Sequence, residues 1–271
     1  MKRKILLCTL AAVLLGLTVA LITGAMADAK WPKSSSGSEK TNGKLKLDSS
    51  YSSDGYFMAA CTKKSKNKLK LRVVKDGETL TYDLNTDGDY EVFPLQLGNG
   101  KYEVSLWENV SGKKYSNAGK ISLSVKMSDV NVCFLYPNQY VNYTKKSEAV
   151  KMADKLCKGK TEKEAYSAIK NFMTTSFVYD FMKAASVKPG LLPDIDGCYK
   201  KHMGVCQDLA AIMVCMLRTQ GIPAKLVIGY ADKNYHAWVA VFLDGKEISF
   251  DPTAALNAIN KPKSYSVERY Y

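Results

Sequence analysis

Three residues in the C-terminal third of the chain have side chains that together could form a covalent catalyst. Cys206 lies in the sequence GVCQD (residues 204–208), directly before an uncharged apolar run that ends at Arg218. If this run is a helix, the thiol lies in its first turn, at the positive end of the helix dipole, which favours the thiolate. His236 and Asp251 are the candidate partners, because an imidazole beside a thiolate forms an ion pair and a carboxylate orients the imidazole. For Cys206 alone, the alternative is a small buried apolar residue.

The spacing between His236 and Asp251 fits two neighbouring strands of an antiparallel sheet. Asp244 and Gly245 are suited to a two-residue hairpin turn. Counting back from this turn, Trp238 pairs with Asp251, so Asp251 lies diagonal to His236 on the same face, with roughly 7–8 Å between the backbones. A register slip of one residue would move Asp251 to the opposite face, so the hypothesis depends on this turn.

The elements that must position these residues follow from the hydrophobic pattern. Apolar residues recur at helical spacing in 147–157, and Thr161 with Glu164 forms a capping box that opens a helix continuing through Phe172. The remaining expected elements are a short strand at 177–179, a loop at 188–200, the helix that begins at Cys206, and strands at 224–230, 235–243 and 246–251. Helices followed by an antiparallel sheet predict an α+β domain at about 145–271.

Residues 44–130 follow a different, period-two pattern. Leu69, Leu71 and Val73 alternate with basic residues, and a two-residue turn then leads into a returning strand. Several short strands at this spacing predict a small all-β sandwich domain of the immunoglobulin or fibronectin III type. The preceding residues 28–43 are rich in Ser, Gly and Lys, which is typical of a flexible linker.

The first 27 residues have the features of an export signal. Basic residues at positions 2–4 precede an apolar stretch, and Ala25, Met26 and Ala27 fit a cleavage site before Asp28. We therefore expect a signal peptide at 1–27 and a protein that is secreted or on the extracellular cell surface. The apolar stretch is also long enough for an uncleaved membrane anchor, which is the alternative.

The overall composition limits the possible partners. The 271-residue chain has a net charge of +13, but its lysines are scattered and often alternate with apolar residues. This pattern indicates solvated strand faces and a weak attraction to anionic cell-surface polymers, so no nucleic-acid partner is expected. Six cysteines follow position 27 at irregular spacing in a chain long enough to build its own core, so no dense disulfide framework is expected. No cofactor is expected either.

Four short sequences in the C-terminal part resemble a known family. GVCQD at 204–208, VIGY at 227–230, YHAWV at 235–239 and FDPT at 250–253, in this order, resemble the bacterial transglutaminase-like superfamily over about residues 145–271. The resemblance implies a papain-like fold, in which a helix bearing Cys packs on an antiparallel sheet bearing His and Asp. It also implies that Cys206 is the nucleophile, His236 the general base and acid, and Asp251 the orienting group.

The resulting hypothesis is an exported cysteine-dependent enzyme that acts on amide bonds of proteins or peptides through a Cys206 thioester. Hydrolysis and transglutaminase-type acyl transfer both remain open, and the expected partner is a protein or peptide substrate, possibly associated with the cell wall, bound by a monomer. One alternative is a catalytically retired cell-surface binding protein. Another is a zinc-binding module that uses Cys198, His202, Cys206 and Cys215. Because the pattern changes near residue 140, we also expect two separate cores and a fragment 140–271 that folds alone.

Overall fold

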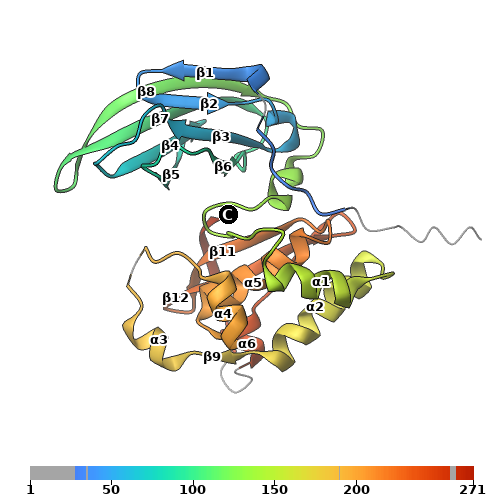
Figure 1. Ribbon diagram of the computed structural model, residues 1–271. Helices are drawn as coiled ribbons and strands as arrows, with labels where there is room; N and C mark the ends of the chain where they lie inside the picture. Colours follow the sequence, from blue (N-terminus) through green and yellow to red (C-terminus); the bar gives the residue numbers. More distant parts are fainter. Residues whose placement is uncertain (1–27, 35, 189, 257–260) are drawn as a thin grey trace, which may run out of the picture.

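The structure, a computed structural model, describes residues 28–271 except 35, 189 and 257–260. Figure 1 shows an all-β region, formed by the first half of the chain, above a region of helices and a further antiparallel sheet. The predicted signal segment, residues 1–27, lies outside the described residues. Within the described part of the chain, no helix combines the length and the apolar character needed to cross a membrane.

The all-β region consists of two four-stranded antiparallel sheets. The first has the order β1-β2-β3-β6, with β1 Glu39–Asn42, β2 Leu45–Asp48, β3 Tyr56–Cys61 and β6 Glu91–Pro94. The second has the order β5-β4-β7-β8, with β4 Leu69–Lys75, β5 Glu78–Leu84, β7 Gly100–Ser111 and β8 Lys114–Val125. Three short 3-10 helices accompany them: η1 Ser36–Ser38, η2 Ser52–Asp54 and η3 Val130–Leu135.

The alternating pattern in this region produces sheets with one buried face. Leu69, Leu71 and Val73 of β4 are at most 1% exposed and belong to a buried cluster that includes residues from both sheets. Asp76 and Gly77, both with positive φ, form the predicted two-residue turn between β4 and β5. The β pattern predicted from the sequence is therefore present as strands, and apolar burial between the sheets is what holds them together.

Part of the segment expected to be a flexible linker is regular structure. Residues 39–42 form β1, which pairs antiparallel with β2. Trp31 packs edge-on against Tyr143, with 5.8 Å between the ring centroids, and the Lys33 N–H donates to the Tyr56 hydroxyl at 2.9 Å. The segment 28–43 thus contacts both regions of the chain. Its Ser-rich composition gave no sign of this, because the contacts come from single residues rather than from a periodic pattern.

The C-terminal region alternates short strands and helices before it forms its main sheet. The first elements are α1 Glu148–Cys157, α2 Glu162–Ser176, β9 Val178–Tyr179, α3 Phe181–Ser186, α4 Ile195–Lys201 and β10 Met203–Gly204. They are followed by α5 Cys206–Arg218, β11 Ala224–Ala231, β12 Asn234–Leu243, β13 Lys246–Phe250, α6 Pro252–Leu256 and β14 Tyr265–Tyr270. The main sheet is antiparallel with the order β13-β12-β11-β14, and β9 pairs in parallel with β10.

Helix α5 is the centre of this region: it contacts α1, α2, α4 and α6, and it packs on β11 and β12 of the sheet (Figure 1). Every residue in 209–217 is fully buried, which matches the uncharged apolar run in the sequence. Leu226 of β11 and Val239 of β12 belong to the same buried cluster and are likewise fully buried. The prediction of a helix that begins at Cys206 and packs on an antiparallel sheet is therefore confirmed.

Several elements differ from the sequence-based expectation. The predicted loop 188–200 contains α4, which is capped by Asp194 through a 2.9 Å hydrogen bond from the Gly197 N–H. The strand expected at 246–251 ends at Phe250, because Pro252 cannot donate to a strand ladder and instead begins α6. The last strand, β14, was not expected at all, and it adds a fourth strand to the main sheet.

The two regions share one buried cluster, so the expectation of two separate cores is wrong. Tyr82 of the all-β region lies edge-on to Tyr271, with ring centroids 6.0 Å apart, and Tyr271 stacks on Tyr140. Arg218, at the end of α5, is fully buried and donates to the backbone carbonyl of Tyr136 at 2.6 Å. The connector between the regions is therefore part of the core.

Candidate active site

Cys206 is the first residue of α5, at the point where β10 leads into the helix. Gly204 of β10 pairs with Tyr179 of β9, and its carbonyl accepts a hydrogen bond from the Asp180 N–H at 3.0 Å. A Cβ at Gly204 would lie 2.8 Å from the Asp208 Cβ, so only glycine allows the strand to pass so close to the start of the helix. Cys206 is partly exposed, whereas the other five described cysteines are buried.

Asp208 anchors the turn that carries Cys206. Its side chain is 0% exposed, and its Oδ2 accepts a hydrogen bond from the Val205 N–H at 3.0 Å. Oδ1 accepts from the Asp194 N–H at 3.1 Å, and Lys183 Nζ of α3 lies 2.7 Å from Oδ2. A buried carboxylate with a cation and backbone donors around it is satisfied in charge and in hydrogen bonds. The loop before α4, helix α3 and the start of α5 are thereby held together.

His236 and Asp251 are in direct contact, as the sequence predicted. His236 is in β12, and its Nε2 lies 2.7 Å from Asp251 Oδ2. The predicted register is confirmed, because Val239 pairs with Phe250 and the pairing runs back from the two-residue turn without a shift. The side chains of His236 and Asp251 are 14% and 7% exposed. The contact is therefore mostly shielded from solvent.

Asp251 accepts hydrogen bonds at both carboxylate oxygens. Oδ1 accepts from the Ala254 N–H at 3.0 Å, because Asp251 directly precedes α6 and caps its first turn. Oδ2 accepts from the Tyr265 hydroxyl at 2.8 Å as well as from His236. Burial raises the pKa of Asp251, but the hydrogen bond and charge of His236 and the two other donors outweigh it and hold the pKa below its usual value. The carboxylate is therefore ionised at neutral pH.

The imidazole of His236 connects Asp251 to the thiol. Burial lowers the pKa of His236, but hydrogen bonds to Asp251 and to Cys206, together with the negative charge of both partners, raise the pKa to about 9. Because Nε2 faces Asp251, Nδ1 is the ring nitrogen that remains for Cys206. The arrangement can hold a thiolate–imidazolium pair at a helix N-terminus, which is the form in which a cysteine is nucleophilic.

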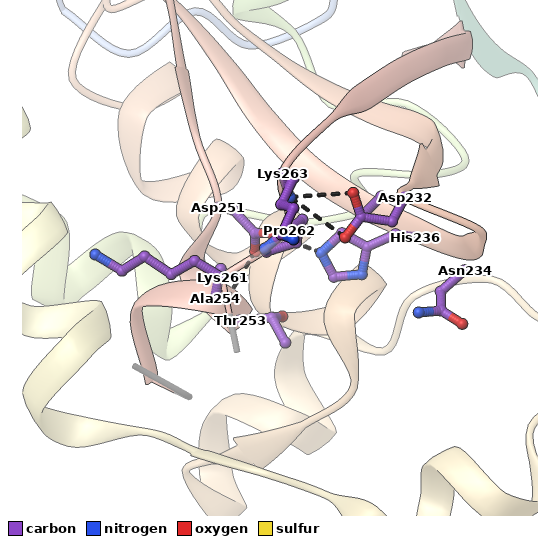
Figure 2. A pocket seen from close by; sticks show the side chains of 10 residues that line it. Asp232, Asn234, His236, Asp251, Thr253, Ala254, Lys261, Pro262 and Lys263 are labelled. Carbon is purple, nitrogen blue, oxygen red and sulfur yellow. Dashed lines mark hydrogen bonds and ion pairs between the residues drawn. The ribbon is translucent and has the colours of Figure 1, made fainter. Parts of the chain in front are cut away.

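An open cleft of about 390 Å³ lies against the imidazole and the carboxylate. Figure 2 shows His236 and Asp251 joined across one side of it, with Thr253 beside them. Asp232, which also lines the cleft, accepts hydrogen bonds from the backbone N–H of Lys263. The Thr253 hydroxyl is buried and has no hydrogen-bond partner within the described chain. The cleft therefore leaves room for a small polar group next to His236.

The residues of the zinc alternative are not brought together. Cys215 lies fully buried in the middle of α5, and Cys198 contacts Lys183 Nζ at 3.5 Å. His202 packs on Phe177, with ring centroids 5.0 Å apart, and its Nδ1 lies 2.9 Å from a backbone carbonyl of α2. In the described ranges of the chain, no three His, Cys, Asp or Glu side chains form a group that could hold a metal ion. The six cysteines in those ranges are free thiols.

Sequence reasoning missed three residues that support the site: Lys183, Asp208 and Tyr265. Asp208 occupies the third position of α5, where an acidic side chain can bond back to the residue before the helix. That spacing was a usable signal. Lys183 and Tyr265 reach the site through contacts between distant segments, and no local pattern marks them.

A family model matches the part of the chain that contains this site. Residues 150–252 match the Transglutaminase-like superfamily. They include Cys206, His236 and Asp251 together with the helix and the strands that position them. Residues 150–252 therefore form a transglutaminase-like domain, and the rest of the chain lies outside the match.

Solved structures of low identity also align with the chain. A "putative cysteine protease" from Cytophaga hutchinsonii is 17% identical, with a TM-score of 0.39, over 80% of this chain and 83% of that protein. A TGase is 17% identical with a TM-score of 0.36, over 43% of this chain and 32% of that protein. Red sea bream transglutaminase is 12% identical with a TM-score of 0.31, over 73% of this chain and 47% of that protein. The chain thus spans less than half the length of both transglutaminases. No curated protein matches the sequence.

Proposed function

We propose that the chain is a cysteine-dependent enzyme that acts on amide bonds of proteins or peptides through a thioester on Cys206. In this proposal His236 is the general base and acid, and Asp251 orients the imidazole. One observation carries it: His236 Nε2 lies 2.7 Å from Asp251 Oδ2, and interaction of the same imidazole with Cys206, the first residue of α5, helps to raise the imidazole pKa. In the proposal, nucleophile, base and orienting group act in this order, and the base and the orienting group lie within hydrogen-bond distance.

The first half of the reaction forms the thioester. The Cys206 thiolate attacks the carbonyl carbon of the amide, and the carbonyl oxygen becomes an oxyanion. The first backbone N–H groups of a helix have no intrahelical acceptor, so the N–H of Cys206 is the proposed donor to this oxyanion. His236 gives its Nδ1 proton to the amide nitrogen, the C–N bond breaks, and an amine leaves. Cys206 then carries the acyl group, and the imidazole is neutral.

The second half transfers the acyl group to an acceptor. A water molecule or a primary amine attacks the thioester carbonyl while neutral His236 accepts its proton. The C–S bond breaks, and the product is an acid with water or a new amide with an amine. Cys206 returns as thiolate and His236 as imidazolium. Hydrolysis and cross-linking use the same residues and differ only in this acceptor.

The place of action proposed for this enzyme is outside the cytoplasm, at the cell surface or beyond it. The support is the sequence of residues 1–27, with its basic start, apolar stretch and small residues at 25–27. A protein or a cell-wall peptide is the corresponding substrate. Sequencing the N-terminus of exported protein should give Asp28 as the first residue. Recovery of chains that begin at Met1 would replace the cleaved signal by a membrane anchor.

The function is tested by trapping the thioester. Purified protein is incubated with peptide amide donors, with and without a primary amine, and intact mass is recorded on rapid acid quench. The wild type should gain the acyl mass on Cys206 and release acid or new amide, whereas Cys206→Ala should do neither. Cys61→Ala, at a buried cysteine of β3, is the matched control and should behave as the wild type. A reactive thiol that yields no acyl-enzyme with any donor would instead favour a catalytically retired binding protein.

A further inference from the structure

Tyr265 contacts the candidate site from β14, a strand outside the four sequence blocks that carry the family resemblance. Its hydroxyl donates to Asp251 Oδ2 at 2.8 Å, and the same oxygen lies 2.7 Å from His236 Nε2. We propose that Tyr265 is a positioning residue, which fixes the Asp251 carboxylate in place and in its charged form so that it can orient His236. The inference rests on the function proposed above for His236 and Asp251.

The position of Tyr265 is fixed by its strand. Tyr265 pairs with Ala231, at the far end of β11, and the pairing between β11 and β14 shifts by one residue at Gly229. A Cβ at Gly229 would lie 2.0 Å from the carbonyl oxygen of Ser266, so β14 can approach β11 only because this residue is glycine. At the start of β14, Asp232 accepts a hydrogen bond from the Ser264 N–H at 3.0 Å. The backbone is therefore held on both sides of Tyr265.

The ring of Tyr265 is fixed as well. It lies edge-on to Trp238, with ring centroids 5.0 Å apart, and Trp238 is only 3% exposed. Trp238 is two residues beyond His236 on the same face of β12, and the two rings stack at 6.4 Å between centroids. Trp238 therefore contacts Tyr265, Tyr265 contacts Asp251, and Asp251 contacts His236. The stacking of His236 on Trp238 completes the ring of contacts. A hydroxyl on a ring held in this way loses little freedom when it binds the carboxylate.

The electrostatic role of Tyr265 has a definite direction. Burial opposes the charged form of Asp251, and a hydrogen bond from a neutral donor stabilises it. Tyr265 remains that donor, because burial, and then its hydrogen bond to Asp251, raise its own pKa well above the usual value. Tyr265 therefore does not act as a base. It donates to Oδ2, the oxygen that also faces His236, a hydrogen bond that water would otherwise have to donate.

The test is Tyr265→Phe in the full chain, read by ¹³C NMR titration of the Asp251 carboxyl carbon. The variant keeps the ring on Trp238 and removes only the hydroxyl. The titration midpoint of Asp251 should rise by about 0.5 to 1 pH unit, which corresponds to the net value of a typical hydrogen bond. The acid limb of Cys206 alkylation should move to higher pH with it. Tyr230→Phe, at an exposed tyrosine of the same sheet, is the matched control and should leave both unchanged.

A second variant separates the hydroxyl from the ring. Tyr265→Leu removes both, and its Asp251 midpoint should match that of Tyr265→Phe. If the midpoint moved in Tyr265→Leu but not in Tyr265→Phe, Tyr265 would act only by packing on Trp238, and the proposal would be overturned. The NMR titration needs no enzymatic turnover. A chain without any acyl transfer could therefore still show the Tyr265 effect, and failure of the function remains distinguishable from failure of this inference.

Discussion

Lys183 Nζ lies 2.7 Å from Asp208 Oδ2, and the carboxylate that it neutralises is completely buried two positions after Cys206. This ion pair connects α3 to the start of α5. Oδ2 also accepts the Val205 N–H, so the carboxylate fixes the backbone immediately before the nucleophile. The candidate nucleophile is therefore positioned by a polar contact inside the domain as well as by the apolar face of its helix.

We predict that Lys183→Met destabilises the protein. The substitution keeps an unbranched chain of similar length but leaves the Asp208 carboxylate buried without a cation. Breaking a buried pair costs about 3 kcal/mol or more, and the low end applies because the Lys183 side chain is 24% exposed. Urea unfolding at neutral pH measures the change. Lys163→Met removes an exposed pair with Asp244 and should have little effect. Equal stability of the two variants would contradict a structural role for the Lys183 pair.

The contact between His236 and Asp251 predicts a loss of stability at alkaline pH. The pKa of His236 rises from 6.5 to about 9 on folding. A raised histidine pKa contributes stability that is complete below pH 6.5 and is lost as the pH rises through about 9. On the acid side, the lowered pKa of Asp251 contributes stability above its unfolded value of 3.8, and this contribution is lost as the pH falls through the lower, folded pKa.

Urea unfolding of the wild type and of His236→Gln at pH 6 and at pH 9.5 measures this contribution. Between pH 6 and pH 9.5, the free energy of unfolding of the wild type should fall by up to about 3 kcal/mol more than that of the variant. His202→Gln is the matched control, because His202 lies at the end of α4 and contacts neither Asp251 nor Cys206 in the described contacts. It should retain the pH dependence of the wild type. If His236→Gln kept the pH dependence of the wild type, the contact between His236 and Asp251 would not be its cause.

The continuous core predicts that residues 140–271 alone are less stable than a fragment that starts at residue 128. The shorter fragment lacks the Tyr136 carbonyl, which accepts from the buried guanidinium of Arg218. Loss of one such acceptor should lower the free energy of unfolding by about 1–3 kcal/mol. Both fragments also lose the contact of Tyr82 with Tyr271, so both should unfold at a lower urea concentration than the full chain. If the 140–271 fragment matched the full chain, the two regions would be independent after all.

The sequence was sufficient for the parts of the site that depend on local pattern. The apolar run after Cys206 defined a buried helix, and the two-residue turn between β12 and β13 fixed the register that brings Asp251 to His236. When a hairpin turn has two residues, the pairing of the strands follows by counting residues back from the turn. A one-residue error in that count would have put Asp251 on the other face of the sheet. These relations are therefore readable without a structure.

The remaining parts depend on contacts between segments far apart in the sequence. Tyr265 follows β11 by more than thirty residues, and the register shift at Gly229 defeats simple counting. Lys183 lies on a two-turn helix whose partner, Asp208, is 25 residues away. Such polar pairs leave no periodicity, because lysine and aspartate are equally suited to an exposed surface. The strand β1 in the expected linker was missed for a different reason: all four of its residues are exposed, so no apolar alternation marks it.

The alkylation of Cys206 by iodoacetamide tests the central claim most directly. Peptide mapping near neutral pH should find Cys206 as the only rapidly modified cysteine of the described chain. Burial raises the pKa of Cys157 and Cys198 to about 11, that of Cys133 to about 12 and that of Cys215 further, and Cys61 is buried. His236→Ala should slow the reaction by at least about tenfold at pH 6, where an ordinary thiol is protonated, and far less at pH 9. His202→Ala should react as the wild type does. Loss of reactivity in His202→Ala, with none in His236→Ala, would contradict the pairing of Cys206 with His236.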